Sequence, residues 1–301
     1  MIHRRDLLIG SAASLTAAVT GSPAVQAEES SADSKASPPI AVFAKPLQAL
    51  PPRELGKRLK SIGVDGIEAT LRVGGQVEPE DFPTKLPPLC DALAESDQRV
   101  VIAATDINAV DVETERQLNL LAAQRIEFVR TKYYRYDFAR PILPQLDDMA
   151  KQAEQLASLC RSLGVTALYQ NHAGQGYVGS ALWDLQRVLA EIDPQHFGVA
   201  VDIRHATVEL STSWRAGYLA IRPHMRALYI KDFIWHEGKP LNVPLGEGYV
   251  RPMFQQILAD GLIGPLSVHM EHLDHRDASL VDQRWLRVVR DVDTLRSWLG
   301  A

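Results

Sequence analysis

Residues 165–174 read VTALYQNHAG. A short apolar run leads to a tyrosine, and Gln170, Asn171 and His172 then follow one another before a glycine. The run itself is typical of a buried strand. Polar side chains gathered just after it are typical of the carboxyl end of a barrel strand, where binding groups collect. The stretch therefore predicts a buried parallel strand that ends at a polar site.

The same pattern recurs along the chain. Segments with apolar residues at spacings of three and four separate the runs, and several of these segments end in Gly or Asp-Gly, as helices often do. An α/β chain of this kind predicts a single (β/α)8 TIM barrel. The eight apolar runs are IAVFA (40–44), GIEATL (66–71), VVIAAT (100–105), IEFVRT (126–131), VTALYQ (165–170), FGVAVD (197–202), RALYIK (226–231) and PLSVHM (265–270).

An open, doubly wound sheet is the alternative fold. Such a sheet often carries a glycine-rich phosphate loop after its first strand. Here KPLQALPPREL (45–55) follows the first run and contains no glycine. No dinucleotide motif or P-loop occurs elsewhere in the chain, so the barrel is favoured and no nucleotide cofactor is expected.

The N-terminus has the layout of an export signal. Arg4 and Arg5 precede a mildly apolar stretch, and Val25 and Ala27 fit a cleavage site. We expect a twin-arginine-type signal peptide (1–27), a disordered linker (28–38) and a barrel domain (39–301), with the mature protein exported to the periplasm. The apolar stretch is short for a membrane anchor, so no membrane span is expected after processing. The alternative is a basic, disordered N-terminus.

Composition narrows the class of partner. Hydrophobic residues make up 46% of the chain and charged residues 23%, as in ordinary globular proteins. A net charge of −5 without a basic tract argues against nucleic acid and favours a small-molecule partner. Cys90 and Cys160 lack metal-type spacing, which leaves two buried thiols or a disulfide. The composition does not decide between a monomer and a homo-oligomer.

Every predicted strand ends in polar side chains. Because the carboxyl ends of barrel strands meet at one rim, these side chains predict a polar pocket for a polar ligand. In chain order they are Lys45, then Glu68 and Arg72, Asp106 and Asn108, Lys132, Tyr134 and Arg135, Gln170, Asn171 and His172, Asp202 and His205, Tyr229, Lys231 and Asp232, and His269, Glu271 and His272.

Six stretches, taken together and in order, resemble the xylose-isomerase-like barrels, the sugar phosphate isomerase/epimerase superfamily. They are GVDGIEATLRVGG, YQNHAG, DIRHATVE, YIKDFIW, VPLGEGYV and LSVHMEH. The resemblance implies a sugar-converting TIM barrel. It also implies a divalent metal (manganese, magnesium or zinc) held by a Glu, an Asp, a His and a Glu on strands five to eight.

Two of those four positions match and two depart. Asp202 and Glu271 stand where the family has Asp and Glu, whereas Gln170 replaces a Glu and Tyr229 replaces a His. Hard divalent ions prefer anionic oxygens and imidazole. Either a histidine completes a metal site, formed by Gln170, Asp202, His205 and Glu271, or no metal binds and Lys231 supplies the positive charge that two facing carboxylates need.

The resemblance and the rim residues together predict proton transfer next to a carbonyl. The expected catalytic residues are Glu271 as base, Lys231, His205 and Glu68. The expected ligand-binding residues are Lys45, Arg72, Lys132, Arg135, Asn171, His172 and Trp235. The leading function is a sugar or sugar phosphate isomerase or epimerase. A lyase or hydrolase acting on an oxidised sugar, and a non-catalytic carbohydrate-binding barrel, are the alternatives.

Overall fold

The computed structural model describes residues 38–262 and 264–300. The predicted signal peptide and residues 28–37 of the predicted linker lie outside the described residues. Within the described part of the chain, no helix combines the length and the apolar character needed to span a membrane.

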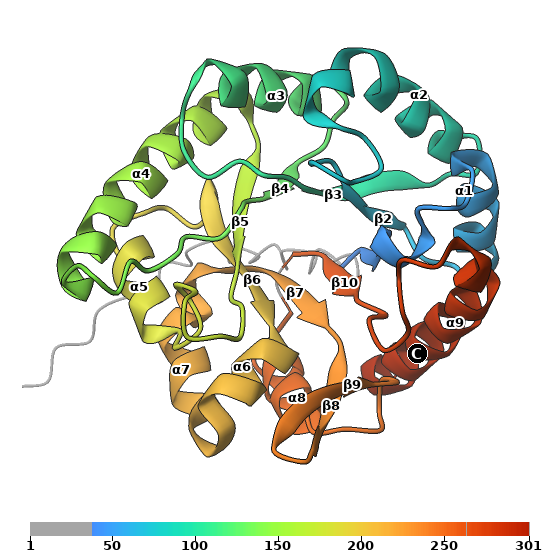
Figure 1. The fold of residues 1–301 in the computed structure, drawn as a ribbon. Coiled ribbons are helices and arrows are strands. Elements are labelled where there is room, and N and C mark those ends of the chain that lie inside the picture. The colour runs from blue at the N-terminus through green and yellow to red at the C-terminus, as the bar shows by residue number, and fades with distance from the viewer. Residues whose placement is uncertain (1–37, 263, 301) are drawn as a thin grey trace, which may run out of the picture. The chain divides into compact units, whose positions relative to one another are not determined.

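A closed barrel of parallel strands forms the centre of the fold (Figure 1), which confirms the predicted architecture. Around the barrel the order is β1-β10-β7-β6-β5-β4-β3-β2, so neighbours in space are neighbours along the chain. The strands are β1 (Ile40–Phe43), β2 (Gly66–Thr70), β3 (Arg99–Ala104), β4 (Phe128–Arg130), β5 (Thr166–Gln170), β6 (Phe197–Asp202), β7 (Met225–Ile230) and β10 (Leu266–Val268).

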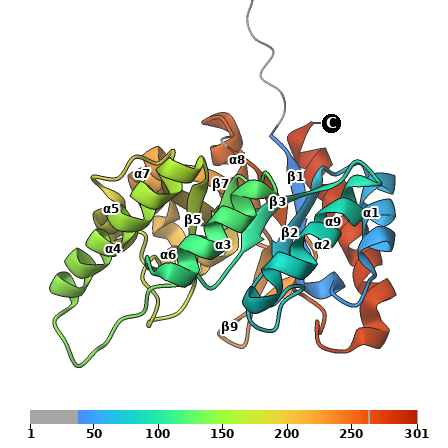
Figure 2. The same ribbon diagram turned by 90° about the horizontal axis from the view of Figure 1, so that it is seen from above.

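Helices surround the strands and bury their outer faces (Figures 1 and 2). The helices are α1 (Pro52–Ser61), α2 (Phe82–Ala94), α3 (Val112–Ala123), α4 (Ile142–Leu163), α5 (Trp183–Leu189), α6 (Ile203–Leu210), α7 (Trp214–Ile221), α8 (Arg251–Ala259) and α9 (Val281–Leu299). Short 3₁₀ turns are η1 (Lys45–Leu47), η2 (Pro79–Asp81), η3 (Ser211–Ser213), η4 (Arg222–His224) and η5 (Ala278–Leu280). Eight segments have the apolar spacing of a helix and each overlaps an observed helix, whereas α6 is an additional helix. The eight segments are 54–63, 89–97, 115–124, 145–164, 181–193, 214–224, 253–261 and 281–300.

The segment after β7 is more ordered than the sequence suggested. The stretch HEGKPLNVPLGEGYV (236–250) contains three glycines and by itself predicts a rim loop, but β8 (Asp232–His236) and β9 (Lys239–Val243) form an antiparallel hairpin. Its turn is Glu237–Gly238, and both residues have positive φ (48° and 73°), as a type I′ turn requires. In Figure 2 the hairpin strand β9 lies at the lower edge of the barrel, where the strands end.

Asp232 fixes the remainder of that segment. Its carboxylate accepts hydrogen bonds from the backbone N–H groups of Gly246 (3.1 Å), Gly248 (2.9 Å) and Val250 (3.2 Å). Gly248 comes so close that a Cβ would lie 2.2 Å from the carbonyl oxygen of Phe233. Only glycine allows this approach, so the loop beside the rim is held by one buried carboxylate.

The barrel interior changes character along its axis. At the amino-terminal end it is filled by small and aliphatic side chains that form a core separate from the larger one beneath the helices, and these include Ala41, Leu168, Ala200 and Ala227. Toward the carboxyl ends the interior becomes polar and charged. The two thiols are free, with Cys160 buried and Cys90 half-buried, so the disulfide alternative is wrong for this structure.

Candidate active site

A cavity of about 260 Å³ opens at the carboxyl ends of the strands. It is lined by side chains from the ends of six barrel strands, from α6 and from the hairpin. The lining residues are Phe43, Lys45, Arg72, Arg130, Tyr133, Gln170, His172, Arg204, His205, Lys231, Asn242, His269 and Glu271.

Lys231 lies between two carboxylates at the base of this cavity. Its Nζ is 2.7 Å from Glu271 Oε2 and 3.2 Å from Asp202 Oδ2. Burial would lower the pKa of Lys231, but the two carboxylates outweigh it and raise the pKa. Burial would raise the pKa of Glu271 and Asp202, but the ammonium lowers both. All three groups are therefore charged at neutral pH.

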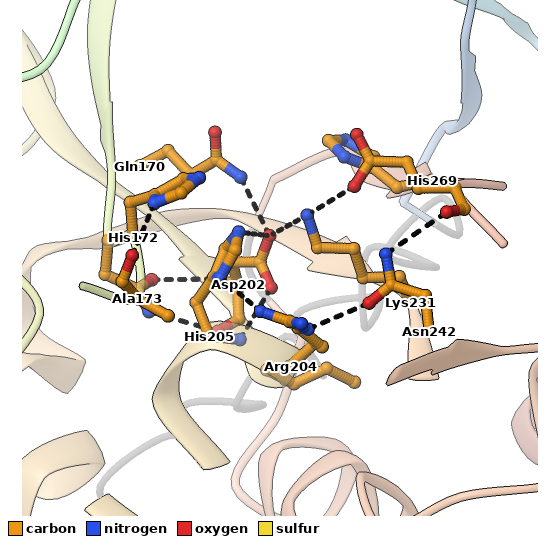
Figure 3. A network of polar contacts seen from close by, with 12 residues as sticks. Gln170, His172, Ala173, Asp202, Arg204, His205, Lys231, Asn242 and His269 are labelled. Carbon is orange, nitrogen blue, oxygen red and sulfur yellow. Dashed lines mark hydrogen bonds and ion pairs between the residues drawn. The ribbon is translucent and has the colours of Figure 1, made fainter. Parts of the chain in front are cut away.

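Asp202 is the hub of the polar network shown in Figure 3. It ends β6 and caps α6, since Oδ1 accepts the backbone N–H of His205 at 3.0 Å. Its Oδ2 accepts the side-chain N–H of Gln170 at 2.8 Å and lies 3.6 Å from His205 Nε2. The fully buried Asp202 thus holds the ends of β5, β6 and β7 together.

Both the oxygen and the nitrogen of the Gln170 side-chain amide form hydrogen bonds. While Nε2 donates to Asp202, Oε1 accepts from Arg130 Nη1 (2.5 Å) and from the Tyr133 hydroxyl (2.7 Å). This arrangement fixes the orientation of the amide. The neutral side chain therefore bridges a cation and an anion, which explains why a glutamine suits this position.

A second ion pair lies deeper in the barrel. Glu68 is fully buried, and its Oε1 lies 3.2 Å from Arg130 Nε. Its Oε2 accepts from Ser267 Oγ (2.7 Å) and contacts His269 Nε2 (2.8 Å). Burial opposes the charge, but Arg130 and His269 bring the pKa of Glu68 to about 2. Glu68 thus supports the site from below and does not line the cavity.

Two histidines in the lining of the cavity contact each other with tilted rings. The rings of His172 and His205 lie 4.0 Å apart. His172 Nδ1 is 2.8 Å from the carbonyl oxygen of Ala173, which can only accept, so Nδ1 carries the proton and Nε2 is left as an acceptor. Burial lowers the pKa of both histidines, so they are neutral at neutral pH.

The cavity carries an excess of positive charge. Five of its lining residues are Lys or Arg, but Glu271 is the one carboxylate among them. Arg130 and Lys231 have carboxylate partners, whereas Lys45, Arg72 and Arg204 have no ion-pair partner within the described residues. Three unpaired cations around a small cavity suit an anionic ligand.

The donor set does not fit a divalent metal. The Lys231 ammonium lies between the two carboxylates that would coordinate the ion, and the Gln170 oxygen already accepts two hydrogen bonds. Across residues 38–262 and 264–300, no three His, Cys, Asp or Glu side chains converge in a way that could hold a metal ion. The protonated Lys231 and a bound cation would compete for the same position between Asp202 and Glu271.

The sequence profile described as "Xylose isomerase-like TIM barrel" matches residues 56–289. The chain belongs to this xylose isomerase-like TIM barrel family. No curated protein matches the sequence significantly.

Solved structures share the fold at low sequence identity. A xylose isomerase-like TIM barrel protein of Mycobacterium smegmatis, in complex with magnesium, is 16% identical with a TM-score of 0.61, over 87% of this chain and 98% of that one. The 3-keto-D-glucoside 4-epimerase YcjR of E. coli is 18% identical with a TM-score of 0.58 (83% and 98%). The probable 3-DHS dehydratase AsbF of Bacillus anthracis is 14% identical with a TM-score of 0.60 (83% and 98%).

The structure brings most of the predicted site residues together. Seven of them line the cavity, namely Lys45, Arg72, Gln170, His172, His205, Lys231 and Glu271, and Asp202 lies directly beneath it. Asn171 is buried and pairs with the backbone of Asp202 (2.7 and 3.0 Å), so it ties β5 to β6.

Besides Asn171, three further predicted ligand-binding residues do not line the cavity. Lys132 is exposed because β4 ends at Arg130 and the chain turns away before it. Arg135 is exposed and stacks on the ring of Tyr177, with its guanidinium carbon 3.9 Å from the ring centre. Trp235 is 46% exposed and lies on the outer part of the hairpin. The predicted binding role of these three residues finds no support in their positions.

The site also contains residues that the sequence argument left out. Arg130 lies within β4 and not after it, and strand alternation would have pointed it inward. Tyr133 follows three residues later. Arg204 and Asn242 come from α6 and β9, two elements that were not predicted, and are joined by a 3.0 Å hydrogen bond. His269 was noted at the rim and supports Glu68.

Proposed function

We propose that the protein is an isomerase or epimerase that moves a proton at a carbon next to a carbonyl in a small anionic carbohydrate. One observation carries the proposal: a buried ammonium, Lys231, lies between Asp202 and Glu271 inside a cationic cavity at the barrel rim. Family membership supports the same class of reaction, because structural neighbours in this family include epimerases.

Lys231 supplies the positive charge that such a reaction needs. Removing a proton next to a carbonyl places negative charge on the carbonyl oxygen, and a fixed cation stabilises that charge. As Lys231 turns its charge toward the developing oxyanion, its hold on Glu271 weakens. The pKa of Glu271 then rises from its lowered value, and the carboxylate becomes basic enough to accept the proton.

His172 is the second acid–base group. It lies on the same strand end as Gln170, two residues further on, and so faces the cavity. Its Nε2 is an acceptor because Nδ1–H is donated to Ala173. Glu271 and His172 come from β10 and β5, which are separated in the barrel by β7 and β6, so the two groups can act on opposite faces of a bound substrate.

Lys231 takes the place that the family implies for a divalent cation, and the proposed reaction is therefore independent of metal. Elemental analysis of the purified protein is expected to show less than stoichiometric manganese, magnesium or zinc. Activity is expected to survive dialysis against a chelator. A tightly bound stoichiometric ion whose removal abolishes activity would contradict this part of the proposal.

Solvent deuterium exchange tests the reaction itself. A panel of ketoses and aldoses, including sugar acids and sugar phosphates, is incubated in D₂O, and deuterium next to the carbonyl is measured by NMR. Wild type is expected to exchange at least one of them. Glu271→Gln is expected to abolish the exchange, whereas Glu237→Gln in the exposed hairpin turn is not. Full exchange by Glu271→Gln would refute the assigned base.

One observation favours a lyase as the second candidate. Glu271 is the one carboxylate among the cavity-lining residues, and an elimination needs a single base and a leaving group rather than a matched pair of carboxylates. The product would be an unsaturated carbonyl compound that absorbs in the ultraviolet. Ligand binding with neither exchange nor absorbance would indicate a barrel that binds carbohydrate without converting it.

A further inference from the structure

A second cavity of about 460 Å³ adjoins the active-site cavity. Lys45 lines both, so the two lie side by side at the rim. The second cavity is lined by Lys45, Pro46, Gln48, Ala49, Gly74, His275, Arg276, Ala278 and Arg284. Four of these residues are basic in type, and no carboxylate is among them.

Arg284, on α9, is the unusual member of this set. The residue is 1% exposed. Its Nη1 donates to the backbone carbonyls of Asp274 and Asp277, both at 2.7 Å, while its Nε is buried without a hydrogen-bond partner. Within the described residues no carboxylate forms an ion pair with it. A buried guanidinium without a counter-ion is costly, so its retention beside a cavity calls for an explanation.

The surrounding groups strengthen the case for an anion. Arg276 is exposed at the mouth of the cavity and adds further positive charge there. His275 beside it adds an imidazole that is neutral at neutral pH, because partial burial and the neighbouring Lys45 lower its pKa. Lys45 has no carboxylate partner among the described residues, and burial together with Arg72 lowers its pKa. Guanidinium groups present a planar fork of donors that matches carboxylate and phosphate oxygens.

We propose that the second cavity binds an oxyanion group, a carboxylate or a phosphate, at the end of the substrate remote from the reacting carbon. This inference rests on the proposed function. If both hold, the substrate is an acidic or phosphorylated carbohydrate that extends over both cavities. Lys45 lies between the two parts. Arg284 and Arg276 hold the anionic end and set the specificity for it.

Calorimetric titration with inorganic phosphate and with glucuronate tests the second cavity without any turnover. Wild type is expected to bind at least one of the two probes at millimolar concentration. Arg284→Gln and Arg276→Gln are each expected to weaken that binding about tenfold, the usual loss for one charge-assisted hydrogen bond. Arg287→Gln, an exposed arginine on the same helix outside both cavities, is the matched control and is expected to bind as wild type does.

Arg276 is exposed, so its variant tests the proposal even if Arg284→Gln fails to fold. Arg72→Gln reports on the neighbouring cavity and is expected to leave binding of the probe largely intact. The proposal is overturned if neither probe binds wild type, or if Arg72→Gln removes the binding while Arg276→Gln behaves like Arg287→Gln. Since Glu271→Gln does not touch this cavity, loss of deuterium exchange and loss of probe binding are separate outcomes.

Discussion

Replacing Lys231 by methionine tests the charge arrangement at the base of the site. The side chain is 6% exposed, and its ammonium pairs with Glu271 at 2.7 Å and Asp202 at 3.2 Å. Methionine preserves much of the apolar stem but removes the charge. Two carboxylates are then left facing each other, and Asp202 is fully buried. Loss of one partner from a buried ion pair costs about 3–5 kcal/mol of the free energy of unfolding.

This cost depends on pH in a direction that the structure fixes. In wild type the pKa of Asp202 and Glu271 is lowered, so their stabilising contribution is present above their unfolded pKa and is lost as pH falls. In Lys231→Met, burial and mutual repulsion raise both values, so the carboxylates destabilise the fold at neutral pH and are relieved as pH falls. The difference between the two proteins is therefore largest at neutral pH and smaller near pH about 4.

Urea unfolding at both pH values, followed by circular dichroism, measures the effect. Lys132→Met is the matched control, because Lys132 is an exposed lysine after β4 without an ion-pair partner in the described chain. The control is expected to change the free energy of unfolding by less than about 0.5 kcal/mol. A Lys231→Met cost no larger than that of the control, or one that does not shrink in acid, would show that the ammonium does not bridge the carboxylates.

Three further predictions follow from single groups. His172→Gln is expected to lower the rate at least about a hundredfold and to remove the acid limb of the pH–rate profile. The reason is that wild type needs the neutral imidazole and loses activity as pH falls through the lowered pKa of His172. An acid limb that is unchanged in the variant would show that another group causes it. Burial raises the pKa of Asp291 to about 7, so wild type loses stability as pH rises from about 4 to 7. Asp291→Asn lacks this carboxyl group and is expected to gain on the order of 2 kcal/mol relative to wild type over that range, whereas the exposed Asp293→Asn gains none. In urea unfolding, Gly248→Ala is expected to lower the free energy of unfolding by about 1–3 kcal/mol, because the added Cβ would meet Phe233 and Asp232. This loss is expected to exceed that of Gly238→Ala, whose Cβ meets nothing within 4 Å. Equal losses would show that the loop is not held as described.

The barrel could be predicted from the sequence because its signal is repeated. Each strand is a short apolar run buried on both faces, and each helix has apolar residues at spacings of three and four, so the alternation is visible even where single boundaries shift. The hairpin after β7 could not be recognised in the same way. Its strands cover the rim and are partly exposed, so β9 lacks a continuous apolar run, and the Glu237–Gly238 turn is a weak signal by itself.

The site could be predicted where a residue lies within three positions of the end of a strand, as Lys231, His172 and Glu271 do. Prediction failed where the strand ended earlier than its apolar run, which placed Lys132 in solvent and left Arg130 unnoticed inside β4. Arg204 and Asn242 reach the cavity from α6 and β9. No sequence pattern within one strand reveals such contacts, because they depend on how the rim segments fold back over the barrel.

The most direct test of the central claim is a crystal structure of the protein grown with manganese, with anomalous scattering measured to locate any ion. We predict Lys231 Nζ within hydrogen-bond distance of both Asp202 and Glu271, and no anomalous peak between these carboxylates. A manganese ion bound to Asp202, Glu271 and Gln170, with Lys231 displaced from them, would contradict the account.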